Sequence, residues 1–232
     1  MTATDRIKPP SALLLALELR YGLELGAHLL TLPFMKLPHG DGHPVMVIPG
    51  FGTTDASSFL LRRALKRLGY AAHGWGQGRN LGMNARAREA LRARLPELHR
   101  EHGRKLSLIG WSLGGVFARE LARHQPEHVR RVITLGSPIN HAPDATNVDA
   151  LFRRKNPDFK HDLEAFRRRC TAPGVPCHAI YSRSDGIVAW QTSLENEAPH
   201  TENVEVFSSH FGLGVNPLVL RVIAERLARP EV

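Results

Sequence analysis

Ser112 has the surroundings that point most directly to chemistry in this sequence. It lies in the segment LIGWSLGG, residues 108–115, with glycine at positions 110, 114 and 115. An apolar run precedes the serine and a helical pattern follows it, which predicts a tight turn between a strand and a helix. In a Gly-x-Ser-x-Gly turn of this kind the hydroxyl projects above the end of the sheet, where it can act as a nucleophile.

A serine hydroxyl is a poor nucleophile until a base removes its proton, and that base needs an acid to orient it. Asp185 follows the predicted strand in AIYSRSDGIV, and His210 follows the next predicted strand in VEVFSSH. Both residues lie downstream of Ser112, in the order Ser, acid, His that this strand–turn–helix arrangement uses. The sequence therefore predicts a catalytic triad of Ser112, Asp185 and His210.

Other residues downstream of Ser112 compete for these two roles. None of the alternative histidines closes a strand in the same way: His141, His161, His178 and His200. The alternative acids lie in a polar stretch between two predicted strands: Asp144, Asp158 and Asp162. Position at the end of a strand thus favours Asp185 and His210.

An attacked carbonyl oxygen becomes negative and needs hydrogen-bond donors nearby. We expect an oxyanion hole made by the backbone N–H groups of Leu113, directly after the nucleophile, and of Phe51, in the turn PGFG after the first strand. Trp111 adjoins the nucleophile and Trp190 follows the acid, so both are candidates for binding an apolar part of a substrate. Packing in the core is the alternative role for each tryptophan.

Short apolar segments alternate with helical patterns along the chain. The predicted strands lie at residues 45–48, 70–75, 106–109, 129–135, 176–182 and 203–207, and the predicted helices at 57–68, 84–102, 113–124 and 216–228. This alternation predicts a single α/β domain over residues 1–232, with a mostly parallel sheet buried on both faces. The polar segment 137–174 breaks the alternation and predicts a small, lid-like helical insertion on the active-site side.

From about Val45 to its end, the chain resembles the α/β-hydrolase superfamily, especially its small bacterial serine esterases and lipases. The matching motifs are the elbow at 110–115, the strand VMVIPG, DGIV at the acid and SHFGL at the histidine. The resemblance implies a reduced sheet of about six strands. It also implies hydrolysis of a carboxylic ester through an acyl-serine intermediate, with no cofactor. Many members carry His-Gly before the oxyanion residue, where this chain has Pro49–Gly50.

Other functions fit the same motifs. An acyltransferase or a thioesterase would use the same triad, and a hydrolase fold can also serve as a non-catalytic ligand-binding module. Loss of a triad member would favour the non-catalytic module, and the sequence lacks none. Acyl-chain length, the alcohol part of the substrate and the oligomeric state are left open by the residues.

The composition of the 232-residue chain, 42% apolar and 23% charged, is typical of one globular domain. Its net charge of +9 comes from 25 arginines and 6 lysines against 22 acids. The basic residues are scattered over several predicted helices without a nucleic-acid-binding motif. We therefore expect a small-molecule or lipid ester as the partner, and no nucleic acid.

Two cysteines, Cys170 and Cys177, flank the segment TAPGVP. They could close one small loop, but no wider pattern of paired cysteines accompanies them, so we expect free thiols. The chain also lacks the Cys and His spacing of a zinc site, and we predict no metal.

The N-terminal region, residues 1–40, is rich in leucine from Leu13 to Leu37. Glu18, Arg20 and Glu24 interrupt the apolar run, which argues against a signal peptide and a spanning helix, so we expect a cytoplasmic protein. Apolar residues at three- and four-residue steps (Leu14, Leu17, Tyr21, Leu25 and His28/Leu29) predict an amphipathic helix that covers the sheet. A membrane-surface anchor and a dimer helix are the alternatives.

Overall fold

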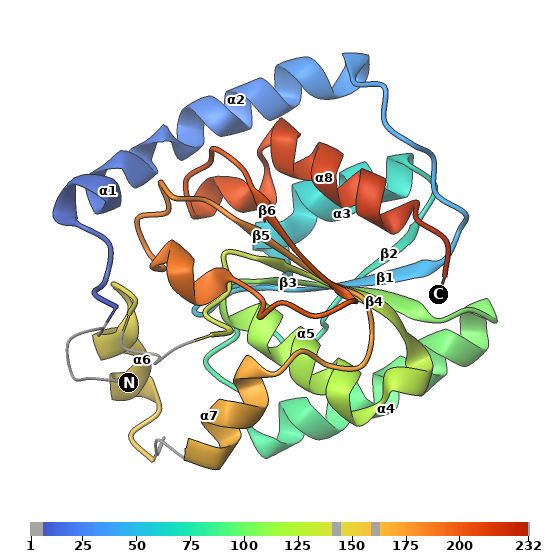
Figure 1. The fold of residues 1–232 in the computed structure, drawn as a ribbon. Helices are drawn as coiled ribbons and strands as arrows, with labels where there is room; N and C mark the ends of the chain where they lie inside the picture. Colours follow the sequence, from blue (N-terminus) through green and yellow to red (C-terminus); the bar gives the residue numbers. More distant parts are fainter. Residues whose placement is uncertain (1–6, 141–144, 159–162, 232) are drawn as a thin grey trace.

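The computed structural model describes residues 7–140, 145–158 and 163–231, which Figure 1 shows as a sheet between layers of helices. Six strands form one parallel sheet in the order β2-β1-β3-β4-β5-β6. The strands are β1 (Pro44–Ile48), β2 (Ala71–Gly74), β3 (Leu106–Trp111), β4 (Val129–Leu135), β5 (Cys177–Tyr181) and β6 (Thr201–Glu205). The predicted reduced parallel sheet is thereby confirmed.

The central strands β1, β3 and β4 are buried along their whole length and mostly apolar because both faces of the sheet are covered. Successive side chains of a strand point to opposite faces, and β1 shows this directly. Val45 and Val47 pack in one core cluster, whereas Met46 and Ile48 pack in the other. The first cluster lies under α3 (Phe59–Arg67) and α8 (Pro217–Leu227), and the second lies under α4 (Ala85–His102) and α5 (Leu113–His124).

Helix ends follow local sequence signals. The Asn84 side chain accepts a hydrogen bond from the Ala87 N–H at 2.8 Å and caps α4, which ends at Gly103 in a left-handed conformation. Asn216 caps α8 in the same way, through the N–H of Leu218 at 2.8 Å. These caps fix where each helix begins relative to the strand before it.

Two short helices, α6 (Asp149–Lys155) and α7 (Leu163–Cys170), lie between β4 and β5, within the segment expected to be an insertion. Residues 141–144 and 159–162 of that segment, with His141, Asp144, His161 and Asp162, lie outside the described residues. The short 3₁₀ helices are Leu17–Arg20, Leu32–Phe34, Asp55–Ser58, Pro126–His128, Trp190–Ser193 and Phe211–Gly214. Cys170 and Cys177 are both free thiols.

The N-terminal segment contains α1 (Ala12–Ala16) and α2 (Tyr21–Thr31), joined by the 3₁₀ turn at 17–20. Figure 1 shows it crossing the outside of the molecule over α8. Its orientation agrees with our expectation only in part. Of the predicted inner stripe, His28 is buried and Leu14, Tyr21 and Leu25 are half-buried, but Leu17 and Leu29 are exposed. Glu18, which is not part of that stripe, is buried. The buried carboxylate meets backbone N–H groups of the loops beneath it, which apolar side chains could not satisfy. None of the described helices combines the length and the apolar character that crossing a bilayer requires.

Candidate active site

Ser112 occupies the sharp turn between β3 and α5. Its φ of 52° and ψ of −123° lie outside the regions that L-residues favour, and it is the only described non-glycine residue with a positive φ. Such a conformation costs roughly 1–3 kcal/mol and persists only where the surroundings impose it. One constraint is the Ser112 N–H, which donates to the carbonyl of Leu135 on β4 at 2.8 Å.

The glycines on both sides of the serine are explained by backbone contacts. A Cβ at Gly110 would overlap the Cα of Gly115, and a Cβ at Gly114 would overlap the carbonyl oxygen of Ile48. Strand β3, helix α5 and strand β1 therefore meet at distances that only glycine permits. The close approach forces the turn at Ser112 to be as tight as it is.

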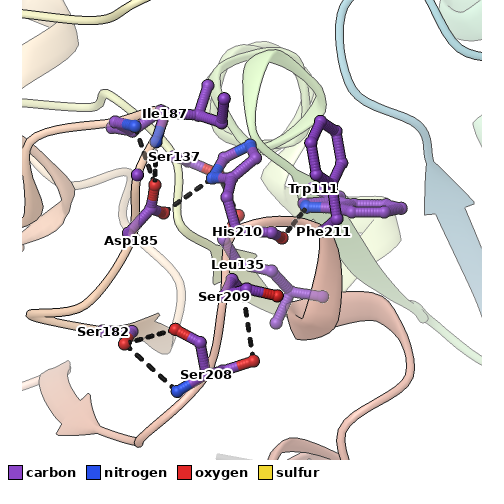
Figure 2. A network of polar contacts seen from close by, with 12 residues as sticks. Trp111, Leu135, Ser137, Ser182, Asp185, Ile187, Ser208, Ser209, His210 and Phe211 are labelled. Atoms are coloured by element: carbon purple, nitrogen blue, oxygen red, sulfur yellow. Dashed lines mark hydrogen bonds and ion pairs between the residues drawn. The ribbon is translucent and has the colours of Figure 1, made fainter. Parts of the chain in front are cut away.

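Asp185 and His210 form a buried pair in the loops after β5 and β6. The Asp185 Oδ2 lies 2.6 Å from the His210 Nδ1, and both side chains are almost fully buried. Figure 2 shows the two side chains facing each other. The other carboxylate oxygen, Oδ1, accepts hydrogen bonds from the N–H groups of Ile187 and Val188, each at 2.8 Å. The loop backbone thus fixes the carboxylate, and the carboxylate fixes the imidazole.

The charge state of His210 follows from two opposing effects. Complete burial would lower the pKa of the imidazole, but the charge and hydrogen bond of Asp185, together with the charge of Glu18, raise this pKa above its ordinary value. The Asp185 contact also holds the proton on Nδ1 and leaves Nε2 able to accept a second proton. A histidine in this state is suited to act as a general base near neutral pH.

The C-terminal end of β4 is where the three predicted triad residues converge. Ser112 is bonded to Leu135, the last residue of β4. A Cβ on the next residue, Gly136, would lie 2.9 Å from the Asp185 Oδ2 and 3.2 Å from the His210 Nδ1. Serine, acid and histidine therefore surround one short stretch of backbone at the carboxyl edge of the sheet, where parallel sheets place their ligands.

The turn after β1 lies directly against the nucleophile. A Cβ at Gly50 would be 3.2 Å from the Ser112 Cβ, and the buried side chain of Asn80 donates to the Pro49 carbonyl at 2.8 Å. In the part of the chain that the structure describes, the N–H groups of Phe51 and Leu113 donate to no other residue. Leu113 is the first residue of α5, where unpaired N–H groups and the helix dipole favour an anion.

Ser112, Leu113 and Phe51 line a cavity of about 630 Å³. The rest of its wall is largely apolar and comes from the segment before α4, from α5, from the insertion and from the loop after β5: Met83, Val116, Phe117, Val148, Phe152 and Val188. Asp149, Lys155 and Arg169 add charge at its edge. Asp185 and His210 do not line this cavity, being buried beside the nucleophile.

The two tryptophans expected near a substrate lie elsewhere. Trp111 is 7% exposed, packs in the core and donates its indole N–H to the His210 carbonyl at 3.1 Å. Trp190 stacks on Tyr181 with 5.7 Å between ring centroids, and the guanidinium carbon of Arg183 lies 4.4 Å from the centroid of the Trp190 ring. Neither lines the cavity at Ser112, because the strand and loop geometry turns both rings away from it.

Sequence reasoning missed the N-terminal residues that support the site. The Glu18 carboxylate accepts hydrogen bonds from the N–H groups of Gly186 at 2.7 Å and of His210 at 2.8 Å. Arg20 donates to the Ser208 carbonyl at 2.9 Å, and Glu24 accepts from the Ser209 N–H at 2.8 Å. Their signal in the sequence is the charge that interrupts a leucine-rich run, which indicates a partner for each charge but does not identify it.

Comparison with known proteins identifies the fold. A family model described as the alpha/beta hydrolase fold matches residues 102–160, the stretch that contains β3, the serine turn and α5. The chain has the α/β-hydrolase fold. No curated protein sequence is a significant match, and among described residues no three His, Cys, Asp or Glu side chains are grouped to hold a metal ion.

Several solved structures share the α/β-hydrolase fold of this chain. Aspergillus fumigatus lipase B superposes with a TM-score of 0.63 at 16% identity, over 84% of this chain and 55% of the lipase. The mature Bacillus licheniformis lipase BlEst2 gives 0.59 at 19% identity, over 83% and 96%. Naproxen esterase from Bacillus subtilis gives 0.58 at 14% identity, over 91% and 98%. The chain thus spans about half of the Aspergillus lipase and nearly all of the two Bacillus enzymes, and these identities relate the folds alone.

Proposed function

We propose that this protein is a serine hydrolase that cleaves carboxylic esters through an acyl-serine intermediate. The observation that carries the proposal is the conformation of Ser112, which lines a largely apolar cavity and is held at a positive φ. The buried Asp185–His210 pair supports it, because that pair lies against Gly136, next to the Leu135 carbonyl that the Ser112 N–H contacts. A strained serine in this position has no packing role that alanine or glycine would not fill as well. The hydroxyl group therefore explains why a serine occupies this strained position.

In the proposed reaction, the Ser112 hydroxyl attacks the ester carbonyl while the His210 Nε2 takes the hydroxyl proton. Asp185 holds the Nδ1 proton and stabilises the imidazolium that forms. The alcohol then leaves with the proton that His210 returns, and Ser112 is left acylated. A water molecule repeats the attack with His210 again as base, which releases the acid and restores the serine.

The tetrahedral intermediates of both steps carry an oxyanion. We assign its stabilisation to the N–H groups of Leu113 and Phe51, which have no other acceptor among the described residues and lie on the two segments that meet at Ser112. Donors that are already in place cost no reorganisation during the reaction. Pro49–Gly50 can stand where many members have His-Gly, because the required donor is the backbone N–H of the next residue, Phe51. The hydrogen bond from Asn80 to the Pro49 carbonyl holds the loop in place.

The apolar wall of the cavity favours the acyl chain of the substrate as its occupant. Phe51, Val116 and Phe152 offer contacts to methylene groups. Two of the solved structures that share the fold are named lipases and one is named an esterase. These names support ester cleavage as the reaction class for this chain.

Covalent labelling tests the proposal. Purified protein should react with a fluorophosphonate probe at Ser112, located by peptide mass spectrometry, and should hydrolyse p-nitrophenyl esters. The Ser112→Ala variant is the matched control and should do neither while its circular dichroism spectrum is unchanged. A folded wild-type protein that never reacts at Ser112 would contradict the hydrolase assignment, and turnover of acyl thioesters alone would replace the ester by a thioester.

A further inference from the structure

The outer side of the N-terminal segment is an apolar surface without a described partner. Six of its side chains are more than half exposed, with Leu19 at 88% and Leu23 at 79%. We call these six residues the leucine face: Leu13, Leu19, Leu23, Leu29, Leu30 and Phe34. Several large apolar side chains exposed on one segment mark a contact site on a soluble protein.

The acidic and basic residues of the same segment face opposite ways, and this arrangement favours one kind of binding partner. Within residues 7–40, the acids Glu18 and Glu24 both turn inward, where they accept hydrogen bonds from the loop at 208–211. Lys8 and Lys36 are exposed, one on each side of the leucine face. The outer surface of this segment therefore presents leucines flanked by cations, which is the pattern of a helix that lies on an anionic lipid surface.

The leucine face continues toward the proposed active site. The exposed ring of Phe207 lies under Arg20, with 5.2 Å between the guanidinium carbon and the ring centroid. Phe211, next to His210, is also exposed. At the other end of the segment, the Pro10 carbonyl accepts a hydrogen bond from Asn147, whose neighbour Val148 lines the cavity. A lipid surface under the leucine face would thus lie close to the cavity.

We propose that the leucine face docks this protein on the surface of an anionic membrane. The binding experiment is carried out with the Ser112→Ala protein, so that its outcome does not depend on the proposed hydrolysis. In a flotation assay, this protein should rise with vesicles that contain phosphatidylglycerol, and this binding should weaken at high salt. Its binding to vesicles of phosphatidylcholine alone should be weaker. The Leu19→Asp/Leu23→Asp variant should bind the phosphatidylglycerol vesicles at least about a hundredfold more weakly, because each substitution removes a large apolar side chain that would be buried in the lipid.

The control variant is Phe59→Asp/Leu151→Asp, which places the same two charges at exposed apolar positions on α3 and α6. It should bind vesicles as the parent does, and circular dichroism should report both variants as folded. Wild-type-like binding by the leucine-face variant would overturn the proposal. So would a parent protein that ignores vesicles but forms dimers that the same two substitutions dissociate, because a second copy would then cover the leucine face.

The inner side of the segment carries an independent inference. The Glu18 side chain is 6% exposed and contacts both loops of the proposed triad. Its Oε1 accepts the N–H of Gly186, next to Asp185, and the N–H of His210, while its Oε2 accepts the N–H of Phe211 at 3.1 Å. The loop at 186 also meets the N-terminal segment so closely that a Cβ at Gly186 would overlap the carbonyl of Leu14.

We infer that Glu18 is a positioning residue that holds the acid loop and the histidine loop together. The charged groups acting on His210 are Asp185 from the loop after β5 and Glu18 from the N-terminal turn, and Arg20 and Glu24 bind the neighbouring residues Ser208 and Ser209. Without the Glu18 charge, one of the causes that raise the pKa of His210 is lost. The histidine should therefore titrate at lower pH.

This inference rests on the proposed function, so its test includes a readout besides turnover. In Glu18→Gln, we expect kcat to fall roughly tenfold or more with little change in KM, and the acidic limb of kcat/KM to move to lower pH. Nuclear magnetic resonance titration of the His210 ring should show the same downward movement even if the protein cleaves no ester. Glu18→Asp, which keeps the charge, should restore the titration. An unchanged His210 titration in a folded Glu18→Gln protein would overturn the inference.

Discussion

Two clusters in this molecule contain the same three residue types, and only one of them has the features of an active site. At the carboxyl end of the sheet lie Ser112, Asp185 and His210. At the opposite end, the His43 Nδ1 lies 2.5 Å from the Asp41 Oδ1, and the His43 Nε2 lies 2.8 Å from the Ser107 Oγ. The second cluster is a complete Ser–His–Asp chain of contacts by distance alone.

The surroundings of the two serines separate the clusters. Ser107 is the second residue of β3, in an ordinary strand, and both it and His43 are fully buried, so no substrate can reach them. Ser112 stands after the last residue of the same strand with a positive φ, a cavity in front and free N–H donors beside it. Identity and mutual distance of three side chains therefore do not define a catalytic site, since access and oxyanion donors are also required.

The electrostatics of the two histidines also differ. Burial lowers the pKa of His43 and outweighs the hydrogen bond of Asp41, and the nearby charge of Arg130 lowers it further. For His210, the charges of Asp185 and Glu18 outweigh burial and raise the pKa. His43 is thus held neutral as a structural link between β1 and β3, whereas His210 is ready to accept a proton.

The largest expected effect compares the two serines. Ser112→Ala should reduce kcat for p-nitrophenyl esters by roughly 10⁶, the scale of removing a catalytic nucleophile, with little change in melting temperature. Ser107→Ala should keep full activity but lose about 1–3 kcal/mol of stability, because the His43 Nε2 is left without its buried partner. Activity assays and thermal unfolding of both variants test these expectations. Loss of activity in a folded Ser107→Ala protein would contradict the structural role of Ser107.

The two carboxylates give the next effect. Asp185→Asn should lower kcat by about 10⁴, because the amide spoils the tautomer of His210, whereas Asp41→Asn should leave kcat unchanged. The hydrogen bonds of His43 and Arg130 hold the pKa of Asp41 below its usual range despite partial burial. Asp41 therefore stabilises the fold above the ordinary aspartate pKa, and its variant should differ from wild type less as pH falls. Denaturant unfolding at several pH values checks this.

A smaller effect tests the cavity, which distinguishes Ser112 from Ser107. Val116→Trp places a large ring in the apolar wall of this cavity. Turnover of p-nitrophenyl palmitate should fall roughly tenfold or more relative to the acetate ester, since a long chain needs the space that the ring removes. Equal losses for both esters would indicate a damaged fold and not a filled acyl site.

The smallest expected effect is the separation of the two histidine pKa values, measured in one resonance titration. His210 should titrate above 6.5 and His43 below it, and the acidic limb of kcat/KM should follow His210. The linked stabilities have opposite signs. The stability that protonation of His210 contributes is present below the pKa of the unfolded state and is lost as pH rises through the raised pKa of the folded state. The stability that neutral His43 contributes is lost as pH falls below 6.5, the pKa of the unfolded state. Titration of both rings at the same pH would remove this difference between the clusters.

Much of the fold could be predicted from local sequence because the signals are local. The segments of β1, β3 and β4 lie where both faces of a sheet are covered, and their high content of apolar residues reports that burial directly. The Gly110–Gly114 turn could be predicted because its spacing of small residues is itself a local pattern. The contact that requires Gly110 is with Gly115, within a few residues of the serine, although the contact that requires Gly114 is with Ile48 on β1. Asp185 and His210 as triad partners stay a prediction, supported by their placement at strand ends and their 2.6 Å contact.

The directions in which Trp111, Glu18 and the N-terminal leucines point were decided by the tertiary structure alone. Periodicity indicates that a helix has two faces, but it assumes that the apolar face turns inward. Here the loops beneath the 3₁₀ turn at 17–20 present backbone N–H groups of Gly186, His210 and Phe211, which donate to the Glu18 carboxylate. A leucine buried in its place would leave these N–H groups without an acceptor, which would cost more than exposing the leucine. The sequence by itself determined the strands, the serine turn and the order of the candidate residues. The inward carboxylate and the outward leucines depend on contacts 168 to 193 residues away along the chain, which no local pattern records.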